Sequence, residues 1–393
     1  MNKTAAAFLI LAFILMGVYA CKDDDTMGDP EEVSYDALIA KFSATIDINN
    51  LPNYATQSIP AYITKDNTTG NEITDKGATL GRVLFYDKML SVDNTVACAT
   101  CHKQELAFSD ADAASTGVNG TTGRHSMRLI NTRFADEEKF FWDERAATLE
   151  EQTTQPIQDH AEMGYSGNDG DPTLVDLILK LKAIDYYPEF FTYVYGDSEI
   201  TEERIQNSLA QFIRSIQSFD SKYDEGRAAA PNNGVNFTNF TATENAGKQL
   251  FMAPPVFDNT GNRTSGGIGC NGCHRAPEFD IAPNSRNNGI TGRIGGGTDL
   301  SNTRSPTLRD VVNATGSVNG LLMHNARFGA IQGVLVHYNS IVNNQNLDNR
   351  LKPNGSLQRL NLTPSERQEL VAFLGTLTGS DVYTNEKWSN PFE

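Results

Sequence analysis

Four of the five cysteines lie in two copies of one short motif, Cys-x-x-Cys-His, at residues 98–102 and 270–274. The copies are 172 residues apart. Each copy follows a similar segment, Gly-Arg-Val-Leu-Phe at 81–85 and Gly-Lys-Gln-Leu-Phe at 247–251, and these segments are 166 residues apart. Because two different features repeat at nearly the same interval, the sequence predicts two copies of one small helical domain.

The histidine that follows each cysteine pair indicates the chemistry of the motif. On a helix the three side chains lie at positions i, i+3 and i+4, so two thiols can bond to a porphyrin edge while the imidazole reaches the iron. A zinc site or a disulfide would accept the cysteine spacing, but neither needs a histidine at the same place twice. We therefore predict two covalently bound c-type haems. Their residues are Cys98 and Cys101 with the iron ligand His102, and Cys270 and Cys273 with the iron ligand His274.

Helical patterns dominate the rest of the chain. Thr201 and Thr363 each open a stretch with apolar residues on one helical face, and residues 171–182 are predicted to be helical as well. No stretch alternates like a strand, so we expect a mainly α fold of two cytochrome c-like helical domains with long irregular loops. Residues 226–240, rich in Ala, Pro, Asn and Gly, are the expected linker. The predicted domains are residues 71–232 and 233–393.

The first residues have the features of a bacterial secretion signal. Lys3 precedes an apolar run, and residues 1–20 form the predicted signal peptide. Val-Tyr-Ala-Cys at 18–21 resembles a lipobox, in which Cys21 receives the lipid and becomes the mature N-terminus. Residues 21–70 are polar and are expected to be a tether and an irregular lead-in. The protein is therefore expected in the cell envelope, lipid-anchored and facing the periplasm or the cell exterior.

The chain is strongly acidic, with a net charge of −17. Removal of a signal peptide whose only charge is Lys3 would make the mature protein more negative by one unit. Nucleic acid and anionic lipid are poor partners for such a chain, so we expect membrane contact through the lipid anchor alone. A basic or neutral soluble protein could be steered toward it.

Several segments between and after the two motifs resemble those of the bacterial di-haem cytochrome c peroxidase and MauG superfamily. They follow the family order and cover roughly residues 75–380. The segments are Ala107–Asp110, Ser115–Gly117, Phe141–Arg145, Leu149–Gln152, Pro156–Ile157, Glu162–Gly164 and Ala372–Gly379.

The resemblance implies a peroxide site at the first haem and an electron-transfer role for the second. By position, Glu162 matches the distal acid, Gln152 the amide beside it, and Trp142 the aromatic residue between the haems. A carboxylate can take a proton from one peroxide oxygen and return it to the other. An amide can hold peroxide by hydrogen bonds without competing for that proton.

Two positions depart from the family pattern near the first haem. Where some members place a distal histidine after Ser-x-Gly, this chain has Val118, so we expect that haem to be open without reductive activation. His125 could replace it if its loop folds back. The segment at 124–128 lacks the family's Arg-Asn-x-Pro, which puts in doubt the calcium ion that relatives hold between domains.

At the second haem, the position of the axial Met of typical peroxidases is occupied by Tyr338, as in the MauG branch. A phenolate stabilises oxidised iron and lowers its potential, whereas a thioether raises it. Tyr338 could instead be a structural residue, with Met323, His337 or water at the iron.

Three functions follow from these observations. The first is a cytochrome-c peroxidase that reduces hydrogen peroxide with electrons from a small donor protein, such as a mono-haem cytochrome c or a cupredoxin. The second is a MauG-like oxidase of a protein or organic substrate, and the third is a non-catalytic electron carrier. A homodimer is a further expectation for this protein.

Overall fold

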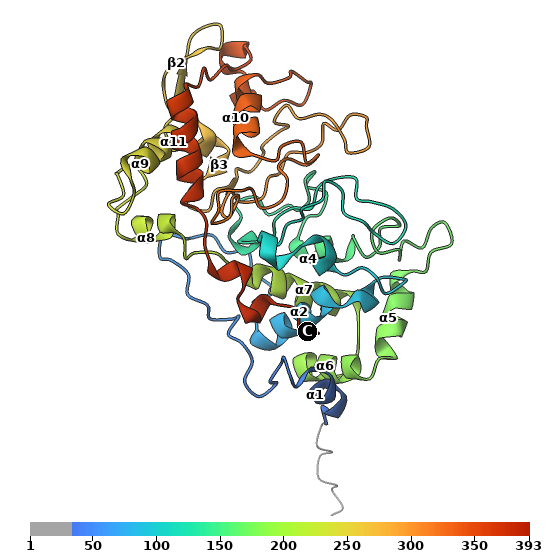
Figure 1. Cartoon of the computed structure of the whole chain (residues 1–393). Coiled ribbons are helices and arrows are strands. Elements are labelled where there is room, and N and C mark those ends of the chain that lie inside the picture. Colours follow the sequence, from blue (N-terminus) through green and yellow to red (C-terminus); the bar gives the residue numbers. More distant parts are fainter. Residues whose placement is uncertain (1–33) are drawn as a thin grey trace, which may run out of the picture. The chain divides into compact units, whose positions relative to one another are not determined.

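Two pairs of crossing helices carry the two apolar cores of the protein (Figure 1). In the computed structural model, which describes residues 34–393, α2 (Asp75–Tyr86) packs on α7 (Glu202–Ser215), and α9 (Ala242–Met252) packs on α11 (Pro364–Gly375). Each helix begins after a threonine whose hydroxyl accepts a hydrogen bond from a backbone N–H of the first turn. We call the part of the chain around the α2–α7 core the first lobe, and the part around the α9–α11 core the second lobe.

The glycine of each repeated segment explains how closely these helices cross. A Cβ atom added at Gly81 would lie 1.9 Å from the carbonyl oxygen of Ser208 on α7. A Cβ atom added at Gly247 would lie 1.9 Å from the carbonyl oxygen of Glu369 on α11. Both distances are far below van der Waals contact, so each crossing needs a residue without a side chain.

The described chain is mainly helical, as predicted, and it also contains two small two-stranded antiparallel sheets that the sequence did not indicate. The sheets pair β1 with β2 and β3 with β4. The remaining elements are α1 (Asp36–Phe42), α3 (Cys98–Cys101), α4 (Leu149–Thr154), α5 (Leu174–Lys182), α6 (Tyr186–Tyr195), α8 (Lys222–Ala228), α10 (Ile331–Asn339), β1 (Pro255–Phe257), β2 (Arg263–Gly266), β3 (His274–Arg275) and β4 (Asp280–Ile281).

The two cysteine motifs fold differently from each other. The first forms the short helix α3, as expected, but the second forms the 3-10 turn η4 (Cys270–Gly272), after which His274 begins β3. A helical second motif was therefore the wrong expectation. Gly269, with φ +74, precedes that turn and Gly272 is its last residue, and glycine is a poor helix former.

The last residues of the chain return from the second lobe to the first. After α11, Val382 and Trp388 are buried in the first core, and Figure 1 shows this segment running back to α2. The guanidinium of Arg82, on α2, donates to the carbonyl oxygen of Ser389 at 2.6 Å. The C-terminal segment thus ties the two lobes together, and the predicted domain boundary near residue 232 stays a prediction.

Residues 1–33, with the predicted signal peptide and Cys21, lie outside the described residues. The lead-in that follows is irregular apart from α1, yet it contributes Leu38, Phe42 and Tyr54 to the first core. Among residues 34–393, no helix has the length and apolar character needed to cross a bilayer.

We predict that Gly81→Ala destabilises the protein by about 1–3 kcal/mol, because the added methyl group has no room at the α2–α7 crossing. Denaturant unfolding of the purified protein measures the change. Gly375→Ala is the control, because Gly375 has open space around its Cβ position, and there we expect a gain of about 0.4–1 kcal/mol. Equal stability of the two variants would contradict the close crossing.

Candidate functional site

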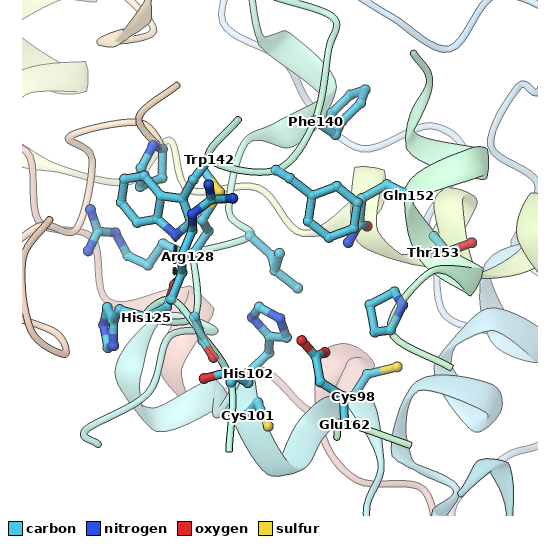
Figure 2. Close-up of a pocket in the computed structure, with 18 of the residues that line it drawn as sticks. Cys98, Cys101, His102, His125, Arg128, Phe140, Trp142, Gln152, Thr153 and Glu162 are labelled. Atoms are coloured by element: carbon cyan, nitrogen blue, oxygen red, sulfur yellow. Dashed lines mark hydrogen bonds between the residues drawn. The ribbon is translucent and has the colours of Figure 1, made fainter. Parts of the chain in front are cut away.

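A cavity of about 570 Å³ in the first lobe brings the predicted site residues together (Figure 2). Its size is in the range of small-molecule and cofactor sites. Figure 2 shows the side chains of His102 and Glu162 directed into the same space, with Gln152 above them. The predicted residues that line this cavity are Cys98, Cys101, His102, Trp142, Gln152 and Glu162.

The imidazole of His102 is held in one tautomer by the turn that follows α3. Its Nδ1 lies 3.1 Å from the carbonyl oxygen of Phe108, and a carbonyl can only accept, so Nδ1 carries the proton. Ala107 and Phe108 both have left-handed backbones, with φ 55 and 60, which direct that carbonyl to the ring. Burial lowers the pKa of His102, which favours the neutral imidazole. The ring therefore offers the Nε2 lone pair that a metal ligand needs.

The carboxyl group of Glu162 is placed by backbone contacts on both sides of the residue. Its carbonyl accepts a hydrogen bond from the N–H of Val118 at 3.0 Å, and its own N–H donates to Asp159 Oδ1 at 3.1 Å. Burial, together with the smaller effect of the nearby charge of Asp159, raises the pKa of Glu162 to about 7 against the opposing effect of Arg145. Near neutral pH this carboxyl can both give and take a proton.

Gln152 reaches the cavity from α4, a helix anchored to the first core. Thr148 caps the start of α4 by accepting from the N–H of Glu151 at 3.1 Å. Glu150 forms a buried ion pair with Arg214 on α7, and a second contact of that pair measures 3.1 Å. Gln152 lies on the face of α4 opposite to Glu150, so this anchoring directs its amide into the cavity that Glu162 also lines.

The loop that precedes Glu162 places two further residues considered from the sequence. Val118 does not line the cavity, and its side chain packs against Gly164. His125 is buried, and its Nδ1 donates to the carbonyl oxygen of Asp112 at 2.9 Å. His125 lines both cavities, and its buried Nε2 has no hydrogen-bond partner among the described residues, so its role as a replacement ligand stays a prediction. An open first haem stays a prediction.

A second cavity of about 160 Å³ contains the residues predicted for the second haem. Burial lowers the pKa of His274 to about 4, so this imidazole is also neutral. Its Nδ1 is buried without a hydrogen-bond partner among the described residues, in contrast to Nδ1 of His102. Cys270, Cys273, Met323 and Tyr338 line the same cavity.

One amide contacts both candidates for the sixth ligand of the second haem. The Nδ2 group of Asn288 lies 3.4 Å from the hydroxyl oxygen of Tyr338 and 3.3 Å from the sulfur of Met323. His337 does not line the cavity, and its Nε2 lies 2.9 Å from the carbonyl oxygen of Asn288. Tyr338, Met323 and water therefore stay as alternatives. Asn288 is a site residue that no sequence pattern indicated. Burial raises the pKa of the Tyr338 phenol.

Trp142 forms part of the wall that separates the two cavities, because it lines both. Its indole N–H donates to the carbonyl oxygen of His125 at 2.7 Å. Its own carbonyl accepts from the N–H of Thr303 at 2.8 Å, which belongs to the second lobe. The ring of His324 meets the indole edge to face at 6.2 Å. Trp142 is thus fixed between the lobes by contacts to both.

The residues of both cavities fit a c-type haem. The four described cysteines are free thiols, so neither motif forms a disulfide in this structure. Residues 34–393 contain no group of three or more His, Cys, Asp or Glu side chains that could hold a metal ion, so a zinc ribbon lacks its ligands. Each cavity instead combines two thiols with one neutral imidazole. The calcium ion between domains stays a prediction.

Comparisons with known proteins agree with this class of site. Residues 75–230 match the family model described as di-haem cytochrome c peroxidase. The methylamine utilization protein MauG of Methylophilus methylotrophus is 28% identical over 332 residues, which cover 82% of this chain and 86% of that protein. Cytochrome-c peroxidase IdrP1 of Denitromonas iodatirespirans is 25% identical over 348 residues, 78% of this chain and 83% of that protein.

Among solved structures, a MauG-like protein associated with microbial copper homeostasis shares the fold. The TM-score is 0.66 at 24% identity, covering 86% of this chain and 99% of that one. The fold and the paired cavities define a two-site cytochrome c-like protein. The matches make it similar to the di-haem cytochrome c peroxidases over residues 75–230 and to MauG and cytochrome-c peroxidase relatives over most of the chain. The description of that family names two haems.

If Tyr338 is the sixth ligand of the second haem, Tyr338→Phe should raise its reduction potential by more than about 59 mV, a tenfold change in a one-electron equilibrium. Spectroelectrochemical titration of the haem-loaded protein measures this. In Tyr338→Phe we expect Met323 to take the free position, with a thioether-to-iron band at the red end of the spectrum. The double variant with Met323→Leu should lack the band. The same band in the unmodified protein would rule out Tyr338.

Proposed function

We propose that this protein is a di-haem c-type peroxidase that reduces hydrogen peroxide to water. Each cysteine pair would hold its haem through two thioether bonds, with His102 and His274 as iron ligands. The observation that supports this function best is the carboxyl of Glu162, whose pKa is raised to about 7 in the cavity that His102 faces. When bound, the haem supplies the electrons that divide the oxygen–oxygen bond.

The side chains of the first cavity would move and hold the protons of this reaction. Glu162, as a carboxylate, takes the proton from one peroxide oxygen and then delivers it to the other, which leaves as water. Gln152 donates a hydrogen bond to the peroxide without competing for its protons. In balance, one peroxide, two electrons and two protons give two waters.

Electrons would reach the first cavity from the second through the shared wall. Trp142 lines both cavities and is fixed by hydrogen bonds to His125 and Thr303, so its indole offers a rigid aromatic path. The phenol of Tyr338 and the thioether of Met323 line the second cavity together with the imidazole of His274. A sixth ligand there would keep peroxide out and leave that haem to electron transfer.

A MauG-like oxidase is the second candidate, and Tyr338 favours it. A phenolate at the second haem would make that haem a poor acceptor from donors of high potential and would suit storage of oxidising equivalents. A non-catalytic electron carrier has no use for a carboxyl of neutral pKa beside the first haem. The two enzymes share the role of Glu162, and they differ in what is oxidised.

We predict that Glu162→Gln lowers kcat/KM for peroxide by about 10²–10⁴-fold. The carboxyl must be ionised to accept the first proton, so kcat/KM of the unmodified protein should rise with pH and level off above about 7. The glutamine variant should lose this rise. Steady-state peroxide consumption from pH 5.5 to 8.5, with a small-molecule reductant, measures both quantities.

Glu138→Gln is the matched control, because Glu138 is exposed and lines neither cavity. Unchanged turnover in Glu162→Gln would remove the acid–base role of Glu162 and favour the non-catalytic electron carrier.

Trp142→Phe separates proton chemistry from electron supply. It should keep the reaction of the fully reduced protein with one equivalent of peroxide and slow steady-state turnover, in which each electron must cross the wall.

We also propose that the protein is exported and lipid-anchored in the cell envelope through Cys21. The apolar run after Lys3 and the Val-Tyr-Ala-Cys segment support this. Cys21→Ser should move the protein from the membrane fraction to the soluble fraction of cells that express it. Membrane attachment of that variant would contradict the lipid anchor.

A further inference from the structure

The second lobe has a surface charge opposite to that of the whole chain. Between residues 233 and 380, no Asp or Glu is exposed, and five of the nine are buried. Six arginines of the same stretch are exposed. They are Arg275, Arg286, Arg293, Arg327, Arg350 and Arg359. The exposed carboxylates of the described chain lie instead in residues 34–232 and 381–393, most of which build the first lobe. Glu225 is an exception, since it lies on α8, which contributes Tyr223 to the second core.

The buried carboxylates of the second lobe are largely neutralised by arginines beside them. Asp348 pairs with Arg350 at 2.7 Å, and Asp299 pairs with Arg124 of the first lobe at 2.7 Å. By contrast, Arg286, Arg327 and Arg359 form no ion pair with any residue of 34–393. Arg286 lines the second cavity, whereas Arg327 and Arg359 line neither cavity, so their unpaired charges contribute to the field that a partner meets.

The three arginines lie on segments that contact one helix, α10. Arg286 is two residues before Asn288, whose carbonyl is bonded to His337. Arg327 precedes Phe328, whose ring lies 6.0 Å from that of His337. Arg359 follows Gln358, whose amide donates to the carbonyl of Tyr338 at 2.9 Å.

α10 and the turn after it expose two apolar side chains, Val336 and Val342, which are 62% and 58% exposed. Tyr338, on the same helix, lines the cavity of His274. We call Val336, Val342, Arg327 and Arg359 the α10 face. It combines exposed apolar side chains with unpaired arginines on segments beside the second cavity.

We propose that the α10 face is the docking surface for an acidic electron-donor protein. The inference rests on the proposed function and adds the charge of the partner. The acidic chain as a whole predicts a basic donor, but a donor is guided by the field at the place where it docks. Carboxylates around an apolar patch on the donor would match the α10 face. One electron would pass to the second haem, and no covalent bond would form or break.

The test measures reduction of the oxidised, haem-loaded full chain by one acidic and one basic mono-haem cytochrome c, without peroxide, in stopped flow. We expect the acidic cytochrome to react faster at low salt and to slow about tenfold or more as salt screens the charges. Arg327→Glu with Arg359→Glu should slow it several-fold at low salt. Neither residue lines a cavity. Lys41→Glu with Lys88→Glu makes the same charge change on exposed residues of the first lobe and should have a smaller effect.

Three results would overturn the proposal: a faster reaction with the basic cytochrome, equal effects of the two double variants, or loss of haem from the Arg327→Glu, Arg359→Glu protein. The last would mean that these arginines serve the cofactor. Reduction by a neutral small-molecule reductant should be the same in all three proteins, which shows that the haems are intact. Peroxide turnover with that reductant is measured separately, so a failure of the peroxidase function is distinct from a failure of the docking surface.

Discussion

Two arginines, Arg124 and Arg128, hold the two lobes in register, and the shared wall of the two cavities depends on them. Arg128 donates to the carbonyl oxygens of Thr307 at 3.1 Å and Asn319 at 3.3 Å, both in the second lobe. Burial lowers the pKa of Arg128 to about 10, so it stays charged at neutral pH. A buried cation is costly unless dipoles or anions surround it, and a shift of the lobes would remove these partners. Arg124 is paired with one aspartate from each lobe. Trp142 lies against the segment between these arginines, so the same contacts fix its place between the cavities.

The helical repeat could be predicted from the sequence because it depends on local signals. Threonine caps and the Gly-x-x-Leu-Phe segments mark α2 and α9, and the structure shows why the glycines matter, since Gly81 and Gly247 each face a backbone carbonyl of the partner helix. The return of the C-terminal segment to the first core could not be predicted, because it depends on contacts such as Arg82 with Ser389 across 307 residues of sequence. The 3-10 turn of the second motif was missed for a different reason. Its cysteine and histidine spacing is that of a helix, while its glycines favour a turn.

The same motif gives two sites with different surroundings. The Nδ1–H of His102 is bonded to a carbonyl, which increases the basicity of Nε2, whereas Nδ1 of His274 has no partner among the described residues. Across the first cavity there is a carboxyl of neutral pKa, and in the second there are a phenol and a thioether. A proton-exchanging group suits a site where a substrate is protonated, and groups that can bind iron suit a site that is closed to substrate. The difference between the two sites thus depends on side chains outside the two Cys-x-x-Cys-His motifs.

The types of residue at the first site were predictable from sequence resemblance, but their physical state was not. Glu162 could be singled out by its place in a family segment, whereas its raised pKa arises from burial beneath loops that are distant in sequence. Asn288 carries no sequence signal, since it lies in a loop rich in Asn and Gly, yet its amide contacts both Tyr338 and Met323. The charge of the α10 face was hidden for a similar reason. Net charge counts every carboxylate equally, but those of the second lobe are buried or half-buried, and the field that a partner meets is set by the arginines that remain exposed.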